Sequence, residues 1–181
     1  ARAAEVLAGG GSVAVVGSAW LSQEEATALK ALADKLGAAA TFVSPEANDL
    51  EDDLLHTGDP APNRKGLEQL GFSAVSAADA AKAVAAADRA VLCGERVLSG
   101  LAGQDLGSTA LVTLDTHPCL ATGVEACIAA PFHVEKAGTW VNVDGLDRLL
   151  TVARQAPAGV EPLDRTLTTL LAELDAPQGA Q

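Results

Sequence analysis

The first 43 residues hold the pattern that most constrains the fold, which is two short apolar runs separated by a helical repeat. Residues 12–17 form a β-branched run that ends at a glycine, typical of a buried parallel strand. Ser22 opens a capping-box pattern, and apolar residues then recur at helical spacing up to Gly37, a suitable left-handed C-cap. Residues 40–43 supply the second strand. A unit of this length matches a right-handed parallel crossover and predicts an α/β fold.

The rest of the chain continues the alternation of strands and helices. We expect helices at 65–70 and 77–87, strands at 73–75, 89–93, 109–114 and 126–130, and a turn or short helix opened by His117. After Pro131, residues 134–143 and 149–152 predict an irregular β-arm. The sequence therefore predicts a doubly wound, mostly parallel Rossmann-like sheet over residues 1–153. Residues 154–181 are expected to form a linker and an amphipathic helix, which must dock on this domain or on a neighbour.

Charge and apolar content exclude several classes of function. The chain has 181 residues, with 12 Lys and Arg against 24 Asp and Glu, giving a net charge of −12. A surface of this sign repels a phosphate backbone, so we expect no nucleic-acid binding. We find no apolar run that could cross a bilayer and expect a cytosolic protein. The chain has no Met and begins Ala1-Arg2, so we expect a fragment of a longer polypeptide. The long connection at 44–64 is a candidate interface loop.

Open α/β sheets hold ligands where the carboxyl ends of neighbouring strands meet, and several polar residues follow the expected strands. The residues expected at this edge are Gly17, Ser18, Gly94, Asp115 and Thr116. Gly17 is followed by Ser-Ala-Trp rather than by G-x-G-x-x-G, so we expect no NAD binding. Glu95 and Asp115 place negative charge where a pyrophosphate would need N–H groups or cations. We expect the geometry of a cofactor edge to persist without its ligand.

Other candidate chemistry has a simpler structural explanation. Histidines and cysteines in the second half have the ligand atoms that zinc prefers, but not the spacing of a zinc site. These residues are His117, Cys119, Cys127 and His133. We expect no metal site, and ordinary reduced, buried thiols that include Cys93. Glu135 could act as an acid or base, but the sequence supplies no partner. We expect it to join a salt bridge or a turn in which Gly138 takes a backbone angle barred to other residues, while Thr139 and Asn142 hydrogen-bond the turn.

Residues 135–145 read Glu-Lys-Ala-Gly-Thr-Trp-Val-Asn-Val-Asp-Gly and follow the last expected sheet strand. This segment resembles the E-K-x-G-T-[FW]-x-N-x-[DE]-G signature of molybdopterin oxidoreductases, a family that includes the large iron–sulfur subunit of NADH:quinone oxidoreductase, respiratory complex I. Residues 111–116 and 121–131 resemble the two segments that precede the signature in that family. Residues 62–71 are similar to the N-x-x-G-x-x-x-L-G stretch of the complex I branch.

The sequence also departs from the family pattern. Cys127 stands where the family usually has Asp, Ala130 where it has Leu, and Leu146-Asp147-Arg148 replaces an expected R-x-Q. The lost arginine and glutamine support the cofactor region in the family. Such departures are typical of a domain that is kept for its architecture.

The resemblance implies a non-catalytic scaffold domain in the peripheral arm of complex I, inactive when isolated, with iron–sulfur clusters elsewhere in the parent subunit and no molybdopterin in this domain. Implied partners are other domains of the same subunit and other peripheral-arm subunits, at the inner face of the cell membrane without insertion into it. Two alternatives stay open. One is a molybdopterin guanine dinucleotide-binding fragment of an enzyme such as a formate dehydrogenase; the other is a stand-alone acidic interaction domain.

Overall fold

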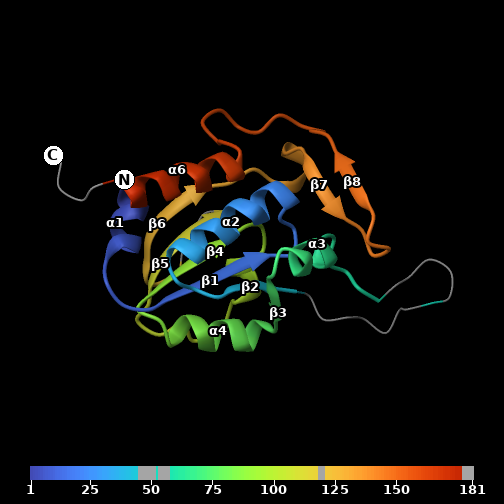
Figure 1. Cartoon of the computed structure of the whole chain (residues 1–181). Helices are drawn as coiled ribbons and strands as arrows, with labels where there is room; N and C mark the ends of the chain where they lie inside the picture. Colours follow the sequence, from blue (N-terminus) through green and yellow to red (C-terminus); the bar gives the residue numbers. More distant parts are fainter. Residues whose placement is uncertain (45–51, 53–57, 118–120, 177–181) are drawn as a thin grey trace.

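The computed structural model describes residues 1–44, 52, 58–117 and 121–176. Its centre is a six-stranded sheet in the order β3-β2-β1-β4-β5-β6, in which every neighbouring pair is parallel (Figure 1). The strands are β1 (Val13–Ser18), β2 (Ala40–Val43), β3 (Ser73–Val75), β4 (Arg89–Cys93), β5 (Ala110–Asp115) and β6 (Val124–Ala129). The predicted α/β fold with a doubly wound parallel sheet is confirmed.

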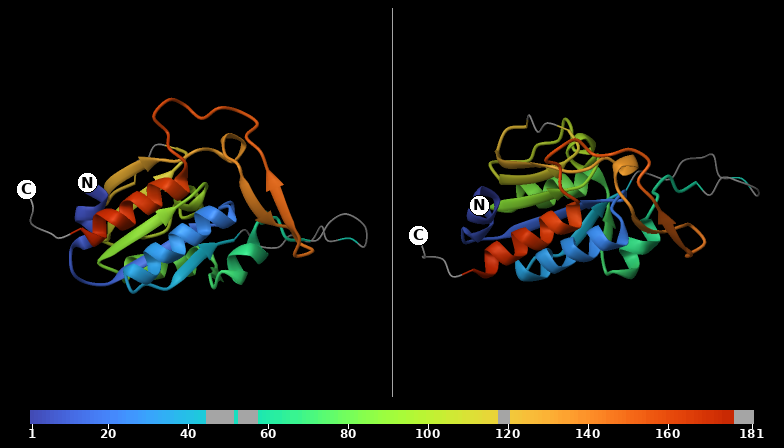
Figure 2. Two further views of the ribbon diagram at one scale, coloured as in Figure 1. Left: turned by 45° about the horizontal axis from the view of Figure 1, so that its top comes forward. Right: turned by 90° about the horizontal axis from the view of Figure 1, so that it is seen from above.

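Six α-helices belong to the described part of the chain, and they form the layers on either side of the sheet. They are α1 (Arg2–Ala8), α2 (Gln23–Lys35), α3 (Arg64–Gln69), α4 (Ala77–Ala85), α5 (Val97–Gly100) and α6 (Leu163–Asp175). Helices α1, α2, α3 and α6 contribute to one core cluster, whereas α4 and α5 share the cluster on the other face of the sheet (Figure 2). The sequence did not predict α1 or α5. None of the described helices is long and apolar enough to cross a membrane.

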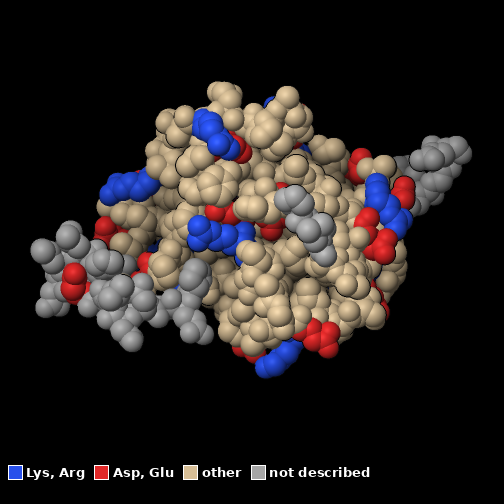
Figure 3. All heavy atoms as spheres, turned by 180° about the vertical axis from the view of Figure 1, so that it is seen from behind, with Lys and Arg blue, Asp and Glu red and all other residues tan. Residues whose placement is uncertain are grey.

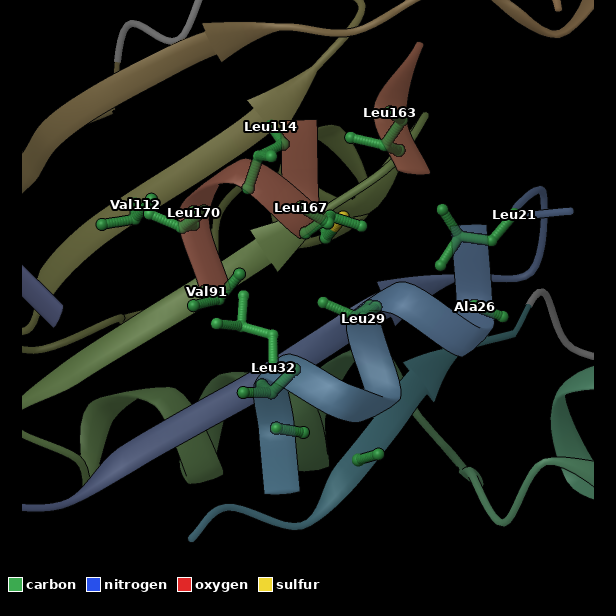
Figure 4. Packing of buried hydrophobic residues seen from close by; sticks show 14 of the residues in the cluster. Leu21, Ala26, Leu29, Leu32, Val91, Val112, Leu114, Leu163, Leu167 and Leu170 are labelled. Atoms are coloured by element: carbon green, nitrogen blue, oxygen red, sulfur yellow. The ribbon is translucent and has the colours of Figure 1, made fainter. Parts of the chain in front are cut away.

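Alternation along the strands divides the core between the two faces of the sheet. Val15 and Val91 point into the cluster with α2 and α6, whereas Val16 and Leu92 point into the cluster with α4 and α5. Figure 4 shows the first cluster, where leucines of α2 and α6 interlock above the β4 and β5 side chains. Because these side chains are apolar on both faces of the central strands, the sheet must be covered on both sides.

Helix α2 begins and ends as its sequence predicts. The Ser22 Oγ accepts a hydrogen bond from the Glu25 N–H at 3.2 Å, and the Glu25 carboxylate accepts one from the Ser22 N–H at 2.8 Å. Gly37 follows the helix with a φ of 66°, in the left-handed region where a glycine is least strained. The terminal helix α6 buries Leu163, Leu167 and Leu170, and it packs on α1 and α2. It therefore docks on its own chain.

The predicted β-arm is present as a two-stranded antiparallel ribbon. A short 3-10 helix, η1 (His133–Glu135), precedes β7 (Gly138–Val141) and β8 (Asp147–Leu150). The ribbon stands beside the N-terminus of α2, near the carboxyl ends of the sheet strands (Figures 1 and 2). Most of the 44–64 connection, predicted as an interface loop, lies outside the described residues.

Candidate functional site

The sheet reverses its strand order between β1 and β4, which is the position where open α/β sheets hold ligands. A cavity of about 460 Å³, called the crevice below, opens at the carboxyl ends of these strands. Its walls come from the ends of β1 and β2, the start of α4 and the segment after β4. The polar or aromatic residues among its described lining are Ser18, Trp20, Ser44, Ser76, Glu95, Arg96 and Ser99.

Gly17, Ser18 and Gly94 lie at this edge, but they serve mainly to pack the strand ends together. The Ser18 Oγ donates a hydrogen bond to the Glu95 carbonyl. A Cβ at Gly17 would lie 3.1 Å from side-chain atoms of Leu21 and Leu29. Gly94 has a φ of 100°, and a Cβ there would lie 2.9 Å from the side chains of Ser18 and Leu21. Both glycines therefore allow a close approach between the strand ends and the β1–α2 connection.

Asp115 and Thr116 lie at the end of the next strand and do not line the same cavity. The Asp115 carboxylate accepts hydrogen bonds from the Thr116 N–H at 2.6 Å and the His117 N–H at 3.3 Å. Asp115 and His117 border a separate hollow of about 340 Å³. The structure thus brings the five predicted edge residues to the same end of the sheet, but not around one cavity. Their role in cofactor binding stays a prediction.

Sequence reasoning missed a distinctive group beside this crevice, in which Trp20 and Arg96 line the cavity and His133 packs against Trp20. The Arg96 guanidinium lies over the Trp20 ring, 4.9 Å from its centroid, and Arg96 is the one described residue other than glycine with a positive φ, at 70°. The His133 ring lies 5.0 Å from the Trp20 ring. No local spacing relates these residues, so only the assembled fold could reveal the group.

Glu95 is almost fully buried below this group. Its carboxylate lies 3.0 Å from the His133 Nδ1 and 3.4 Å from the Arg96 Nε. It also accepts a hydrogen bond from the His133 N–H at 3.3 Å. The carboxylate thus occupies the floor of the crevice with its partners already in place. Arg96 is the exposed cationic group among the described lining residues, and it is shared between Glu95 and Trp20.

Residues 135–145, the arm that carries the family resemblance, are held to the N-terminus of α2 by a buried ion pair. The Lys136 Nζ lies 2.6 Å from the Glu25 carboxylate and donates a second hydrogen bond to the Trp20 carbonyl at 3.1 Å. The Lys136 and Glu25 side chains are only 8% and 5% exposed. Glu25 also closes the capping box of α2, so its pair with Lys136 joins the helix start to the arm and, through the Trp20 carbonyl, to the crevice wall.

Glu135 pairs with Arg154 instead of facing a reactive site. The Arg154 guanidinium and the Phe132 N–H both donate to its carboxylate, and these bonds lower the pKa of Glu135 below its usual value. The expected salt bridge is confirmed, and its partner follows the ribbon. A carboxylate held in its ionised form in this way is poorly suited to donate a proton.

Two expectations about the arm are wrong. Gly138 does not have a left-handed backbone; instead, a Cβ at this position would lie 2.7 Å from the Ser22 Cβ, so the glycine permits close contact with α2. Thr139 does not bond the turn, because its N–H and hydroxyl both donate to the Glu24 carboxylate, at 3.0 and 2.9 Å. Burial opposes ionisation of Glu24, but these hydrogen bonds outweigh it and lower the pKa of Glu24.

Asn142 hydrogen-bonds the turn of the ribbon as expected, and Gly145 completes this turn. The Asn142 Oδ1 accepts from the Asp144 and Leu146 N–H groups at 3.1 and 2.8 Å, and Gly145 has a φ of 82°. The fully buried Asn63, near the end of the 44–64 connection, supplies a further anchor. Its side chain donates to the Leu21 carbonyl at 2.7 Å and accepts from the Val141 N–H at 2.7 Å. The amide thus links the β1–α2 connection to β7.

Across the described ranges, no group of three His, Cys, Asp or Glu residues could hold a metal ion. Cys93 is buried, and burial raises the pKa of its thiol. Cys127 is exposed, because its side chain points outward from the edge strand β6. The expectation that all the thiols are buried is therefore wrong. Cys119 lies outside the described residues.

On the face seen in Figure 3, blue Lys and Arg atoms stand in small groups, most of them beside red Asp and Glu atoms.

Neither a model of a known protein family nor a curated protein matches this chain.

Proposed function

We propose that this chain is a non-catalytic scaffold domain of a larger oxidoreductase subunit, of the kind found in the peripheral arm of NADH:quinone oxidoreductase. One observation supports this proposal above all. The polar residues of the resemblance-bearing arm are engaged inside the domain, with Lys136 paired to Glu25, Glu135 to Arg154, and Thr139 bonded to Glu24. Residues that are satisfied in this way hold the domain together and have little capacity left for a ligand or a reaction.

The charge at the carboxyl edge of the sheet supports the same proposal. Glu95 occupies the floor of the crevice, and the Asp115 carboxylate already takes the N–H groups that follow β5. A pyrophosphate at this edge would meet two carboxylates where it needs N–H donors or cations. We therefore propose that the domain holds neither molybdopterin nor an iron–sulfur cluster. The clusters of the parent subunit would lie in other parts of that polypeptide.

The proposed partners follow from the resemblance and from the charge. They are other domains of the same subunit and other subunits of the peripheral arm. We propose that the domain lies in the cytoplasm, at the inner face of the cell membrane, where the parent complex holds it. Because the chain has a net charge of −12, nucleic acid is not among the proposed partners.

Turnover by the purified chain tests this proposal. The chain, mixed with NADH and ferricyanide as an artificial acceptor, is expected to show no NADH oxidation above the rate without protein. A dehydrogenase assayed in the same buffer supplies the positive control. Saturable oxidation of NADH by the chain would contradict the proposal.

The crevice favours a second candidate function, the binding of a guanine dinucleotide cofactor. A cavity of about 460 Å³ at the reversal of strand order, with Arg96 and several hydroxyl groups in its wall, has the place and size of a ligand site. Because Trp20 lines this cavity, titration with GMP followed by tryptophan fluorescence tests the candidate. A saturable change in fluorescence that is lost in R96Q would favour a cofactor domain. The scaffold proposal predicts no saturable change in fluorescence up to millimolar GMP.

A further inference from the structure

The crevice holds a fixed guanidinium that still has hydrogen-bond donors to spare. The Arg96 guanidinium lies over the Trp20 ring, and its Nε lies 3.4 Å from the buried Glu95 carboxylate. Its two terminal nitrogens have no partner among the described residues. Because a guanidinium can bind one carboxylate through two parallel N–H···O bonds, Arg96 offers a preformed place for a single negative group.

The backbone at Arg96 is strained in the conformation that places this guanidinium. Its φ of 70° lies in the left-handed region, and no other described residue except glycine has a positive φ. Strained residues persist only where the surrounding structure holds them, and they cluster at ligand sites. Here the Trp20 ring and the Glu95 carboxylate hold the side chain on the crevice wall. The turn after β4 is therefore built to present the guanidinium to the crevice.

The serine hydroxyls of the crevice cannot share this task, because three of them already donate their proton within the chain. The donors and their acceptors are Ser18 to the Glu95 carbonyl, Ser76 to the Asp79 carboxylate, and Ser99 to the Arg96 carbonyl. A hydroxyl group has one proton, so these serines can accept hydrogen bonds but have none left to give to the oxygens of an anion. Among the described lining side chains, Arg96 is the one with charged donors left.

The rest of the lining is largely apolar. Trp20, Val43, Ala77 and Val97 supply these walls around the volume of about 460 Å³. Sites for small molecules commonly have this size, with apolar walls and a few polar groups that fix the orientation of the ligand. One charged anchor beside apolar walls fits a compound with a single polar end and an apolar body.

The charges near the crevice favour one negative charge on that polar end over two. The Glu95 carboxylate lies at the floor, and the whole chain carries a net charge of −12. Arg96 can neutralise one carboxylate, but a second negative charge would meet Glu95 with no further cation among the described lining residues. The crevice is therefore better suited to a monocarboxylate than to a phosphate ester.

We infer that the crevice binds a small monocarboxylic acid with an apolar body. Its carboxylate accepts hydrogen bonds from the terminal nitrogens of Arg96, and its body packs against Trp20, Val43 and Val97. This inference goes beyond the proposed scaffold function, which requires no ligand and would stand without it. It also differs from the guanine dinucleotide candidate, which needs donors for several phosphate oxygens.

Calorimetric titration of the 181-residue chain with 4-phenylbutanoate at neutral pH tests the inference. We expect saturable binding, and binding of 4-phenylbutanamide that is weaker by about tenfold, because the amide keeps the shape of the acid but lacks its charge. R96Q should weaken the acid by about tenfold and leave the affinity for the amide nearly unchanged. R148Q is the matched control, since it removes an exposed arginine of β8 that does not line the crevice, and it should bind the acid as the wild type does.

A second variant, A77F, keeps the test decisive if R96Q does not fold. The phenyl ring would fill part of the crevice while Arg96 stays in place, so both the acid and the amide should bind more weakly. Four outcomes would overturn the inference. They are no saturable binding of the acid up to its solubility limit, equal binding of the acid and the amide, unchanged affinity for the acid in R96Q or A77F, and tighter binding of 4-phenylbutyl phosphate than of the acid. The last outcome would assign the crevice to a phosphate ester. None of these outcomes changes the NADH test, so the ligand site and the scaffold function are judged separately.

Discussion

At the scale of single residues, the Lys136–Glu25 pair shows how this domain uses charge. Both side chains are buried, and the Glu25 carboxylate also accepts the Ser22 N–H that begins α2. A buried pair of this kind adds little compared with an apolar pair of the same size, but removing one partner leaves the other charge stranded. Its role is therefore to specify where the arm sits on the helix.

Substitution of Lys136 by Met tests this role. K136M should lower the free energy of unfolding by about 3 kcal/mol, because the Glu25 carboxylate loses its cation while it stays buried. The double variant E25Q/K136M should recover part of the loss, since no charge is then left unpaired. Urea denaturation measures all three proteins.

The matched control is K30M, which removes the exposed Lys30–Asp34 pair on the same helix. It should change the free energy of unfolding by no more than about 0.5 kcal/mol. A K136M variant as stable as K30M would show that the buried pair does not hold the arm.

At the scale of elements, the ribbon is fixed along β7 and open along β8. Asn63 and Glu24 satisfy the outward N–H groups of β7, whereas the outward N–H groups of β8 face away from the domain. The same ribbon is therefore both an anchor and an exposed edge. Hydrogen exchange should separate the two edges.

The Val141 amide should exchange at a rate close to that of the sheet core, because its acceptor is the fully buried Asn63. The Leu149 amide should exchange at least about tenfold faster. Exchange resolved by NMR measures both amides in one sample. Equal protection of Val141 and Leu149 would contradict the open-edge geometry.

The ion pair at the base of the ribbon makes its stability depend on pH. Arg154 and the Phe132 N–H lower the pKa of Glu135, whose usual value is 4.5. A carboxyl group with a lower pKa in the folded state contributes stability above its unfolded pKa and loses it as the pH falls through the folded pKa. The wild type should therefore be more stable than E135Q at about pH 6, and the difference should shrink below about pH 4.

Thermal denaturation over this pH range measures the difference. R154Q should remove most of the same pH-dependent contribution, because it deletes the larger of the two interactions that lower the pKa of Glu135. A constant gap between the wild type and E135Q across the range would mean that the carboxylate charge does not stabilise the ribbon.

The elements differ in how far the sequence could predict them. Local patterns were sufficient for α2, where Ser22 and Gly37 mark the ends, and for β1 and β4, where an apolar run ends at a glycine. Helix α1 was missed because seven residues carry too little periodicity. The contacts of the site could not be predicted in the same way. Lys136 and Glu25 are 111 positions apart, and the stacking of Arg96 on Trp20 depends on the packed crevice.

At the scale of the whole molecule, a Rossmann-like sheet carries a ribbon that locks onto α2 and leaves one edge free. The carboxyl edge of the sheet has a cavity, but buried Glu95 and the satisfied Asp115 oppose a bound pyrophosphate. The crevice lies where open α/β sheets hold ligands, whereas the β8 edge of the ribbon is exposed.

Metal and nucleotide analysis of the oxidoreductase subunit to which we propose that this domain belongs tests the central claim most directly. The protein, purified without denaturation, is analysed for molybdenum by mass spectrometry, and acid-released guanine nucleotides are quantified by chromatography. A known molybdopterin enzyme taken through the same purification provides the control. The scaffold account predicts neither molybdenum nor guanine nucleotide in proportion to the protein. Stoichiometric molybdenum together with released GMP would contradict it and would establish the domain as part of a cofactor site.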